Sequence, residues 1–160
     1  MERLVPGICK KIGLGSQKNP AIGFNANMRK VSILAVGKRL RSPFDQLCNE
    51  YTKRLGSRPE LRWLWHRGEK ELLEAASQMN HVIYLSEHGP TCDTRGFKRI
   101  LEASPEIGFV IGPAEGFSER PQGELLSLSP LTFPHEMAMC VLVEQIYRAK
   151  TLIEGHPYHK

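Results

Sequence analysis

The C-terminal tail of this 160-residue chain concentrates groups that could do chemistry. Its last five residues, His156-Pro-Tyr-His-Lys160, bring together two imidazoles, a phenol and an amine. Imidazoles exchange protons near neutral pH, aromatic rings stack on RNA bases, and cations contact phosphates. The tail is therefore a candidate RNA-binding and proton-transfer element, with an ordinary frayed terminus as the alternative.

Two segments further upstream could bind a ligand. The turn Gly112-Pro-Ala-Glu-Gly116 follows an apolar run, and open α/β sheets bind ligands at the carboxyl ends of their strands. Its spacing matches neither GxGxxG nor GxxxxGK[ST], so taken alone it favours a tight turn. The loop from Leu128 to Phe133 is unusually apolar for a surface loop, so it could enclose an adenine ring or belong to the core.

A metal site is not expected. Pro157 prevents His156 and His159 from sharing one helix face. The cysteines are Cys9, Cys48, Cys92 and Cys140, and they show no paired spacing. This pattern favours free thiols in a reducing cytoplasm. Without a signal-peptide core or an apolar stretch of about 20 residues, a soluble cytoplasmic protein is expected. A net charge of +5 permits polyanion binding without requiring it.

The elements that must position these groups alternate along the chain. Short β-branched or alternating apolar runs predict strands over residues 31–37, 61–66, 81–86, 107–112 and 125–129. Helical periodicity predicts helices over about 43–55, 69–78 and from 93 onward, and a long helix from Pro134 to Gly155. This alternation predicts an α/β class with a mainly parallel sheet. Residues 28–160 are expected to form one domain, preceded by a poorly ordered extension over residues 1–27.

The long C-terminal helix carries more apolar surface than one buried stripe requires. Apolar residues cover more than one of its faces between Met137 and Ile153. A helix on the surface of a monomer needs only one apolar stripe. The pattern therefore predicts a second buried contact, such as a partner subunit.

Several motifs together resemble the RlmH family of SPOUT methyltransferases. At the C-terminus they are Leu131-Thr-Phe-Pro-His135, Val143-Glu-Gln-Ile-Tyr-Arg-Ala149 and Gly155-His-Pro-Tyr-His-Lys160. The segments 31–38, 50–55 and 109–112 match in the same order, so the resemblance covers residues 28–160. It implies methyl transfer from S-adenosylmethionine to N3 of a pseudouridine in the 23S ribosomal RNA of the large subunit.

The same resemblance implies a fold and a set of site residues. The fold would be a SPOUT-type α/β knot, a deep trefoil, whose final helix forms a homodimer. The implied cofactor-binding positions are Leu85, Gly112, Leu128, Ser129, Pro130, Leu131, Thr132 and Phe133. The implied substrate-side, catalytic positions are His135, Arg148, His156, Tyr158 and His159, without a metal.

Two competing functions stay open at this point. One is a non-catalytic RNA-binding module with the same fold, and the other is a SPOUT methyltransferase that acts on another RNA. Binding of S-adenosylmethionine distinguishes the non-catalytic module from an enzyme, because failure to bind would favour the module. His159 and His156 are the proton acceptors favoured by their ordinary pKa values near neutrality, and the sequence leaves the choice between them open.

Overall fold

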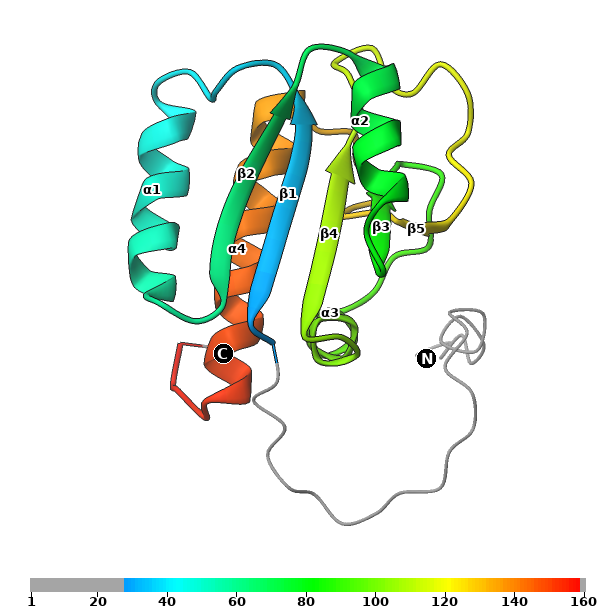
Figure 1. Cartoon of the computed structure of the whole chain (residues 1–160). Helices are drawn as coiled ribbons and strands as arrows, with labels where there is room; N and C mark the ends of the chain where they lie inside the picture. Colours follow the sequence, from blue (N-terminus) through cyan, green and yellow to red (C-terminus); the bar gives the residue numbers. More distant parts are fainter. Residues whose placement is uncertain (1–27, 159–160) are drawn as a thin grey trace, which may run out of the picture.

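The computed structural model describes residues 28–158, and its elements alternate as predicted (Figure 1). The strands are β1 (Lys30–Val36), β2 (Glu60–His66), β3 (Val82–Leu85), β4 (Glu106–Ile111) and β5 (Glu124–Leu126). The helices are α1 (Phe44–Leu55), α2 (Glu69–Ser77), α3 (Thr94–Glu102) and α4 (His135–Ile153). The expected N-terminal extension lies outside the described residues, as does His159.

The five strands form one sheet in the order β2-β1-β4-β3-β5, and every strand pair is parallel. The predicted α/β class is therefore confirmed. β1 lies inside the sheet and is apolar on both faces: Val31 and Ile33 point to one side, Leu34 to the other, and all three are fully buried. Because the strands are parallel, all their carboxyl ends lie along one edge.

Helices cover both faces of this sheet (Figure 1). α1, α3 and α4 pack on one face around the larger core, and α2 packs on the other against a smaller cluster that includes Leu34 and Val110. α4 contacts both α1 and α3 as well as the sheet. Its apolar residues Leu142, Val143 and Ile146 are fully buried within the chain.

The packing of α4 explains why its apolar surface is so wide. A helix enclosed by a sheet and two neighbouring helices needs more than the single stripe of a surface helix. The wide apolar surface of α4 that the sequence predicted is therefore buried largely within one chain. It does not by itself require a partner subunit. The homodimer and the trefoil knot stay predictions.

The ends of α4 lie where the sequence predicted them, but β5 is shorter than expected. Pro134 precedes the first turn of α4, and Gly155, with a φ of +67°, follows its end. β5 ends at Leu126 because the next residues form a turn of their own. Ser127 Oγ donates to the Ser129 carbonyl at 2.8 Å, and Ser129 Oγ accepts the Leu131 N–H at 2.9 Å.

Residues 28–158 contain no candidate for a membrane-spanning helix or for a metal site. No helix in this range is long and apolar enough to cross a membrane. No group of three or more His, Cys, Asp or Glu side chains in the same range is placed to hold a metal ion.

Candidate active site

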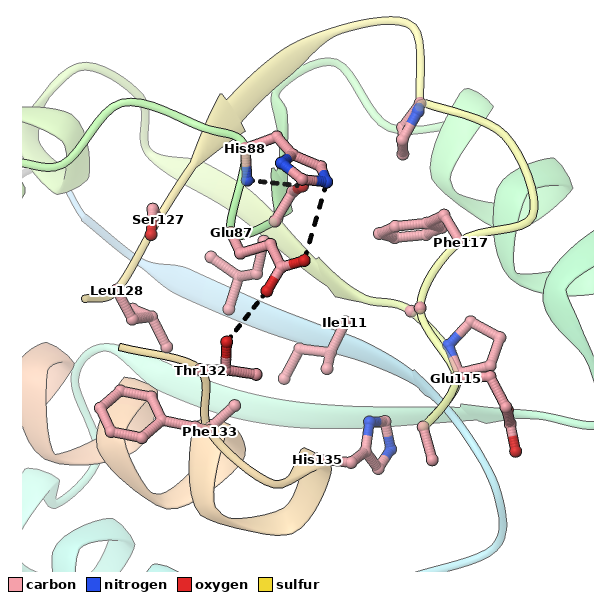
Figure 2. A pocket seen from close by; sticks show the side chains of 18 of the residues that line it. Glu87, His88, Ile111, Glu115, Phe117, Ser127, Leu128, Thr132, Phe133 and His135 are labelled. Carbon is pink, nitrogen blue, oxygen red and sulfur yellow. Dashed lines mark hydrogen bonds and ion pairs between the residues drawn. The ribbon is translucent and has the colours of Figure 1, made fainter. Parts of the chain in front are cut away.

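A cavity of about 580 Å³ opens at the carboxyl ends of β3, β4 and β5 (Figure 2). Three segments line it: residues 85–88 after β3, residues 111–121 around the end of β4, and, after β5, residues 127–129 and 131–133. The turn at Gly112 and the apolar loop at Leu128 each allowed two interpretations from the sequence. The structure brings both to one cavity, where the parallel sheet places the ends of these strands.

Most of the positions predicted to hold the cofactor line this cavity: Leu85, Gly112, Leu128, Ser129, Leu131, Thr132 and Phe133. Pro130 is exposed and does not line it. The hydrogen bond between Leu131 and Ser129 closes a turn that leaves Pro130 at its tip. Sequence reasoning missed Glu87, His88 and Phe117, although Glu87 and His88 directly follow β3 and could have been found by the same strand-end rule.

Polar contacts join two of the loops over the cavity (Figure 2). Thr132 Oγ1 donates to Glu87 Oε2 at 3.1 Å, and the His88 imidazole lies 3.7 Å from the same carboxylate. The His88 backbone N–H donates to Ser86 Oγ at 3.3 Å. Glu87 and Thr132 are exposed, so these bonds order the loops without adding much stability.

Gly112 is needed for the close packing at the end of β4. A Cβ atom at this position would lie 3.0 Å from the ring of Phe117. The Phe117 ring in turn packs edge-on against Tyr84, with ring centroids 6.1 Å apart. The Gly116 N–H donates to the Pro113 carbonyl at 2.9 Å and closes the turn. Glycine therefore allows this loop to fold back over the strand end.

His135 begins α4 at the wall of the cavity and is half-buried. Burial lowers the pKa of its imidazole below the ordinary value of 6.5, and a hydrogen bond with the Val36 backbone opposes this effect only in part. The ring is therefore uncharged at neutral pH. A neutral imidazole that donates one N–H to a carbonyl keeps its other nitrogen as an acceptor.

Three of the other predicted substrate-side residues, Arg148, His156 and Tyr158, lie at the far end of α4. A helical rise of about 1.5 Å per residue places Arg148 about 20 Å from His135 along the axis. Tyr158 returns against this end of the helix, and its ring centroid lies 4.8 Å from that of Tyr147. His156 is exposed. Of the predicted substrate-side residues within 28–158, only His135 therefore lines the cavity of its own chain.

The cluster at the far end of α4 is itself well ordered by charge and ring contacts. Arg148 Nη2 donates to Glu144 Oε1 at 2.6 Å, and its guanidinium lies 5.0 Å from the centre of the Tyr158 ring. A hydrogen bond with Tyr51, together with partial burial, raises the pKa of Tyr158 to about 12. The phenol therefore stays protonated at neutral pH and can donate a hydrogen bond but cannot act as a base.

Comparison with known proteins now decides the family. A family model described as "Predicted SPOUT methyltransferase" matches residues 29–159. The chain belongs to the SPOUT methyltransferase family. The resemblance carried by the C-terminal motifs is thereby confirmed for almost the whole domain.

Curated relatives of this SPOUT methyltransferase share one name, "Ribosomal RNA large subunit methyltransferase H". The relative from Parasynechococcus marenigrum is 38% identical over 142 residues, which cover 84% of this chain and 99% of the relative. A relative from Thermus thermophilus is 39% identical over 137 residues, covering 82% and 98%. The relative from Protochlamydia amoebophila is 34% identical over 140 residues, covering 83% and 100%.

Proposed function

We propose that this chain is an S-adenosylmethionine-dependent methyltransferase that methylates N3 of a pseudouridine in the 23S ribosomal RNA of the large subunit. The observation that carries the proposal is the convergence of three strand-end loops on one cavity in a chain of the SPOUT family. The relatives named as large-subunit ribosomal RNA methyltransferases support the choice of substrate.

The cavity suits S-adenosylmethionine in size and chemistry. About 580 Å³ lies within the usual range for small-molecule sites. Leu85, Ile111 and Leu128 offer apolar surface for an adenine ring, while the carboxylates of Glu87 and Glu115 suit a ligand with a positively charged sulfonium. When bound, this cofactor supplies an electrophilic methyl group. The residues of the chain then have to exclude water and position the RNA base.

His135 is the described residue best placed to accept the N3 proton of the target base. It lines the cavity, and its lowered pKa keeps a ring nitrogen free to accept a proton at neutral pH. This choice differs from His156 and His159, which the ordinary pKa of histidine favoured. His156 is exposed at the far end of α4, and His159 lies outside the described residues.

Arg148, His156, Tyr158 and His159 would act on the cavity of a second subunit. In one chain Arg148 lies about 20 Å from His135 along α4, so residues at both ends can meet one base only if two chains combine. We infer a homodimer in which α4 and the loop before it form the contact. The exposed apolar side chains of Leu131 (74% exposed) and Met137 (37%) supply apolar surface for it. The trefoil knot is part of the same proposal.

The proposal is tested by incubating purified large subunits that lack the modification with the protein and S-adenosylmethionine. Mass spectrometry of the digested ribosomal RNA should reveal one new N-methylated pseudouridine. Isothermal titration with S-adenosylmethionine should show binding to the protein alone. Binding without methylation of any ribosomal or transfer RNA would contradict the proposed activity, and methylation of another nucleotide would contradict the proposed target.

A further inference from the structure

We propose that a second cavity, next to the first, binds a single-stranded segment of the substrate RNA beside the methylated nucleotide, with Arg39 contacting its phosphate. The proposal rests on the proposed function and adds a surface to it. The second cavity measures about 320 Å³ and shares Ala114 and His135 with the first. RNA bound in the second cavity would therefore lie next to His135, at the border with the first.

The wall of this second cavity is held in place by Arg41 and Glu136. The Arg41 backbone N–H donates to Glu136 Oε1 at 2.8 Å, and its guanidinium Nη2 lies 3.0 Å from Oε2. These bonds, with the guanidinium, hold the pKa of Glu136 below its ordinary range, so the carboxylate stays charged and paired. Leu40 is buried between Arg39 and Arg41. The loop after β1 is thus anchored to α4, and Arg39 projects from an ordered segment.

Charge distinguishes the two cavities. The first is lined by the carboxylates of Glu87, Glu115 and Glu119, with one arginine, Arg120. The second is lined by Arg39 and by Arg41 with its partner Glu136, and Lys38 precedes Arg39 in the same loop.

Arg39 and Lys38 are both exposed, and neither forms an ion pair with another residue in the range 28–158. A phosphate is therefore repelled from the first cavity and attracted to the second.

Aromatic rings complete the second cavity. Phe44 and Trp65 line it and are half-buried. The Trp65 ring is stacked on Trp63 with centroids 5.3 Å apart and an angle of 5° between the planes, which fixes its orientation. Aromatic faces next to an arginine are the combination that binds unpaired RNA bases and their backbone. A protein partner would not need the unpaired cations, so RNA is the occupant that these residues favour.

The test compares Arg39→Gln with Lys70→Gln. Lys70 lies on α2, its side chain is 89% exposed, and it lines neither cavity, so replacing it removes the same charge outside both. Binding of a labelled single-stranded RNA is measured by fluorescence anisotropy at several salt concentrations. We expect Arg39→Gln to weaken binding about three- to tenfold and to reduce the salt slope by about 0.7, as loss of one phosphate contact requires. Lys70→Gln should leave both unchanged.

Two further readouts sharpen this test. Of the two tryptophans of the chain, Trp65 lines this cavity and Trp63 stacks on it, so RNA binding should quench the fluorescence of the wild-type protein. S-adenosylmethionine should bind Arg39→Gln as tightly as wild type. Equal RNA affinity and equal salt slopes in the two variants, or no quenching, would overturn the proposal. Normal RNA binding with weakened binding to whole large subunits would also overturn it, because it would assign the surface to a protein.

These results separate the two proposals. Weaker RNA binding by Arg39→Gln without methylation by the wild-type protein would support the RNA surface and contradict the proposed function. Methylation by both proteins with the same KM for large subunits would support the proposed function and overturn the RNA surface.

Discussion

The two ends of α4 differ in how they are built. At its beginning, His135 adjoins a cavity made of loops that follow parallel strands, so backbone topology assembles the site. At its end, Arg148 and Tyr158 form a cluster of side chains on one helix and the tail that follows it. One end therefore has the shape of a small-molecule site, and the other has the groups of a nucleic-acid contact.

The difference teaches that the predicted site residues within 28–158 form two separate, ordered groups at opposite ends of α4. The cluster at the end of α4 is also tied to the domain, since Lys150 Nζ donates to the Leu55 carbonyl at 2.9 Å. Lys150, in the last turn of α4, complements the helix dipole there as well. Stability thus accounts for part of this cluster, and measurements of activity separate that role from a contact with RNA.

Removing the tail should have the largest effect. A chain truncated after Gly155 loses residues 156–160, among them His156, Tyr158 and His159. Its methyl-transfer rate should fall about 10²- to 10⁴-fold, the usual contribution of acid–base and positioning groups. The affinity for S-adenosylmethionine, measured by titration calorimetry, should stay at the wild-type value because the cavity lies at the other end of α4. An unchanged single-turnover rate would remove the tail from the mechanism.

The middle of α4 should behave as core. Leu142→Ala should lower the free energy of unfolding by about 2–5 kcal/mol, because Leu142 is fully buried. Val141→Ala, on the neighbouring and only half-buried position, is the matched control and should cost distinctly less. Denaturant titration measures both. Equal losses would mean that the outer face of α4 is as buried as the inner one, which would point to a larger subunit contact.

Filling the space at Gly112 should damage only the cavity at the beginning of α4. Gly112→Val would push against the Phe117 ring, and overpacking of this kind costs about 1–3 kcal/mol, so affinity for S-adenosylmethionine should fall about tenfold or more. Gly68→Ala is the control, since a Cβ there meets nothing within 4 Å. Thermal unfolding should show that both variants fold. Wild-type affinity in Gly112→Val would place the cofactor elsewhere.

The smallest effect concerns pH. Because burial lowers the pKa of His135, its imidazole is neutral above the ordinary value of 6.5 and gains a proton only below it. The methyl-transfer rate should therefore be level near neutrality and fall, by at most about tenfold per pH unit, as the pH drops below the lowered pKa.

The same shift affects stability. The unfolded chain binds the proton more readily than the folded one, so stability should also decline below about pH 6.5. His135→Gln should abolish the acidic limb of the rate profile, whereas the exposed His88→Gln should leave it in place. An acidic limb that persists in His135→Gln would assign the base to another residue.

Much of the fold could be predicted because the apolar pattern is strong. The run from Val31 to Val36 is typical of a strand buried on both faces, and Pro134 and Gly155 mark the ends of α4 by their backbone restrictions. β5 was predicted too long because the hydroxyls of Ser127 and Ser129 compete for backbone partners, a contact that periodicity does not reveal.

The site was harder to predict than the fold. Leu128 and Gly112 are distant in sequence, and only the order of strands in the sheet brings them together. The separation of Arg148 from His135 follows simply from the helical rise, so it was available from the sequence once the helix was predicted. The second cavity could not be predicted from the sequence, because only the fold places Arg39 beside Trp65 and α4.

The central claim is that one active site uses the cavity of one subunit and the tail of another. Mixing two impaired variants tests it most directly, at a concentration of S-adenosylmethionine too low to load the Gly112→Val cavity. Gly112→Val has an intact tail, and the chain truncated after Gly155 has an intact cavity. If the chains exchange, about half of the dimers are mixed and each holds one complete site, so methylation of large subunits should recover to about a quarter of the wild-type rate. No recovery in a mixture that calorimetry and mass measurement show to contain mixed dimers would contradict the claim.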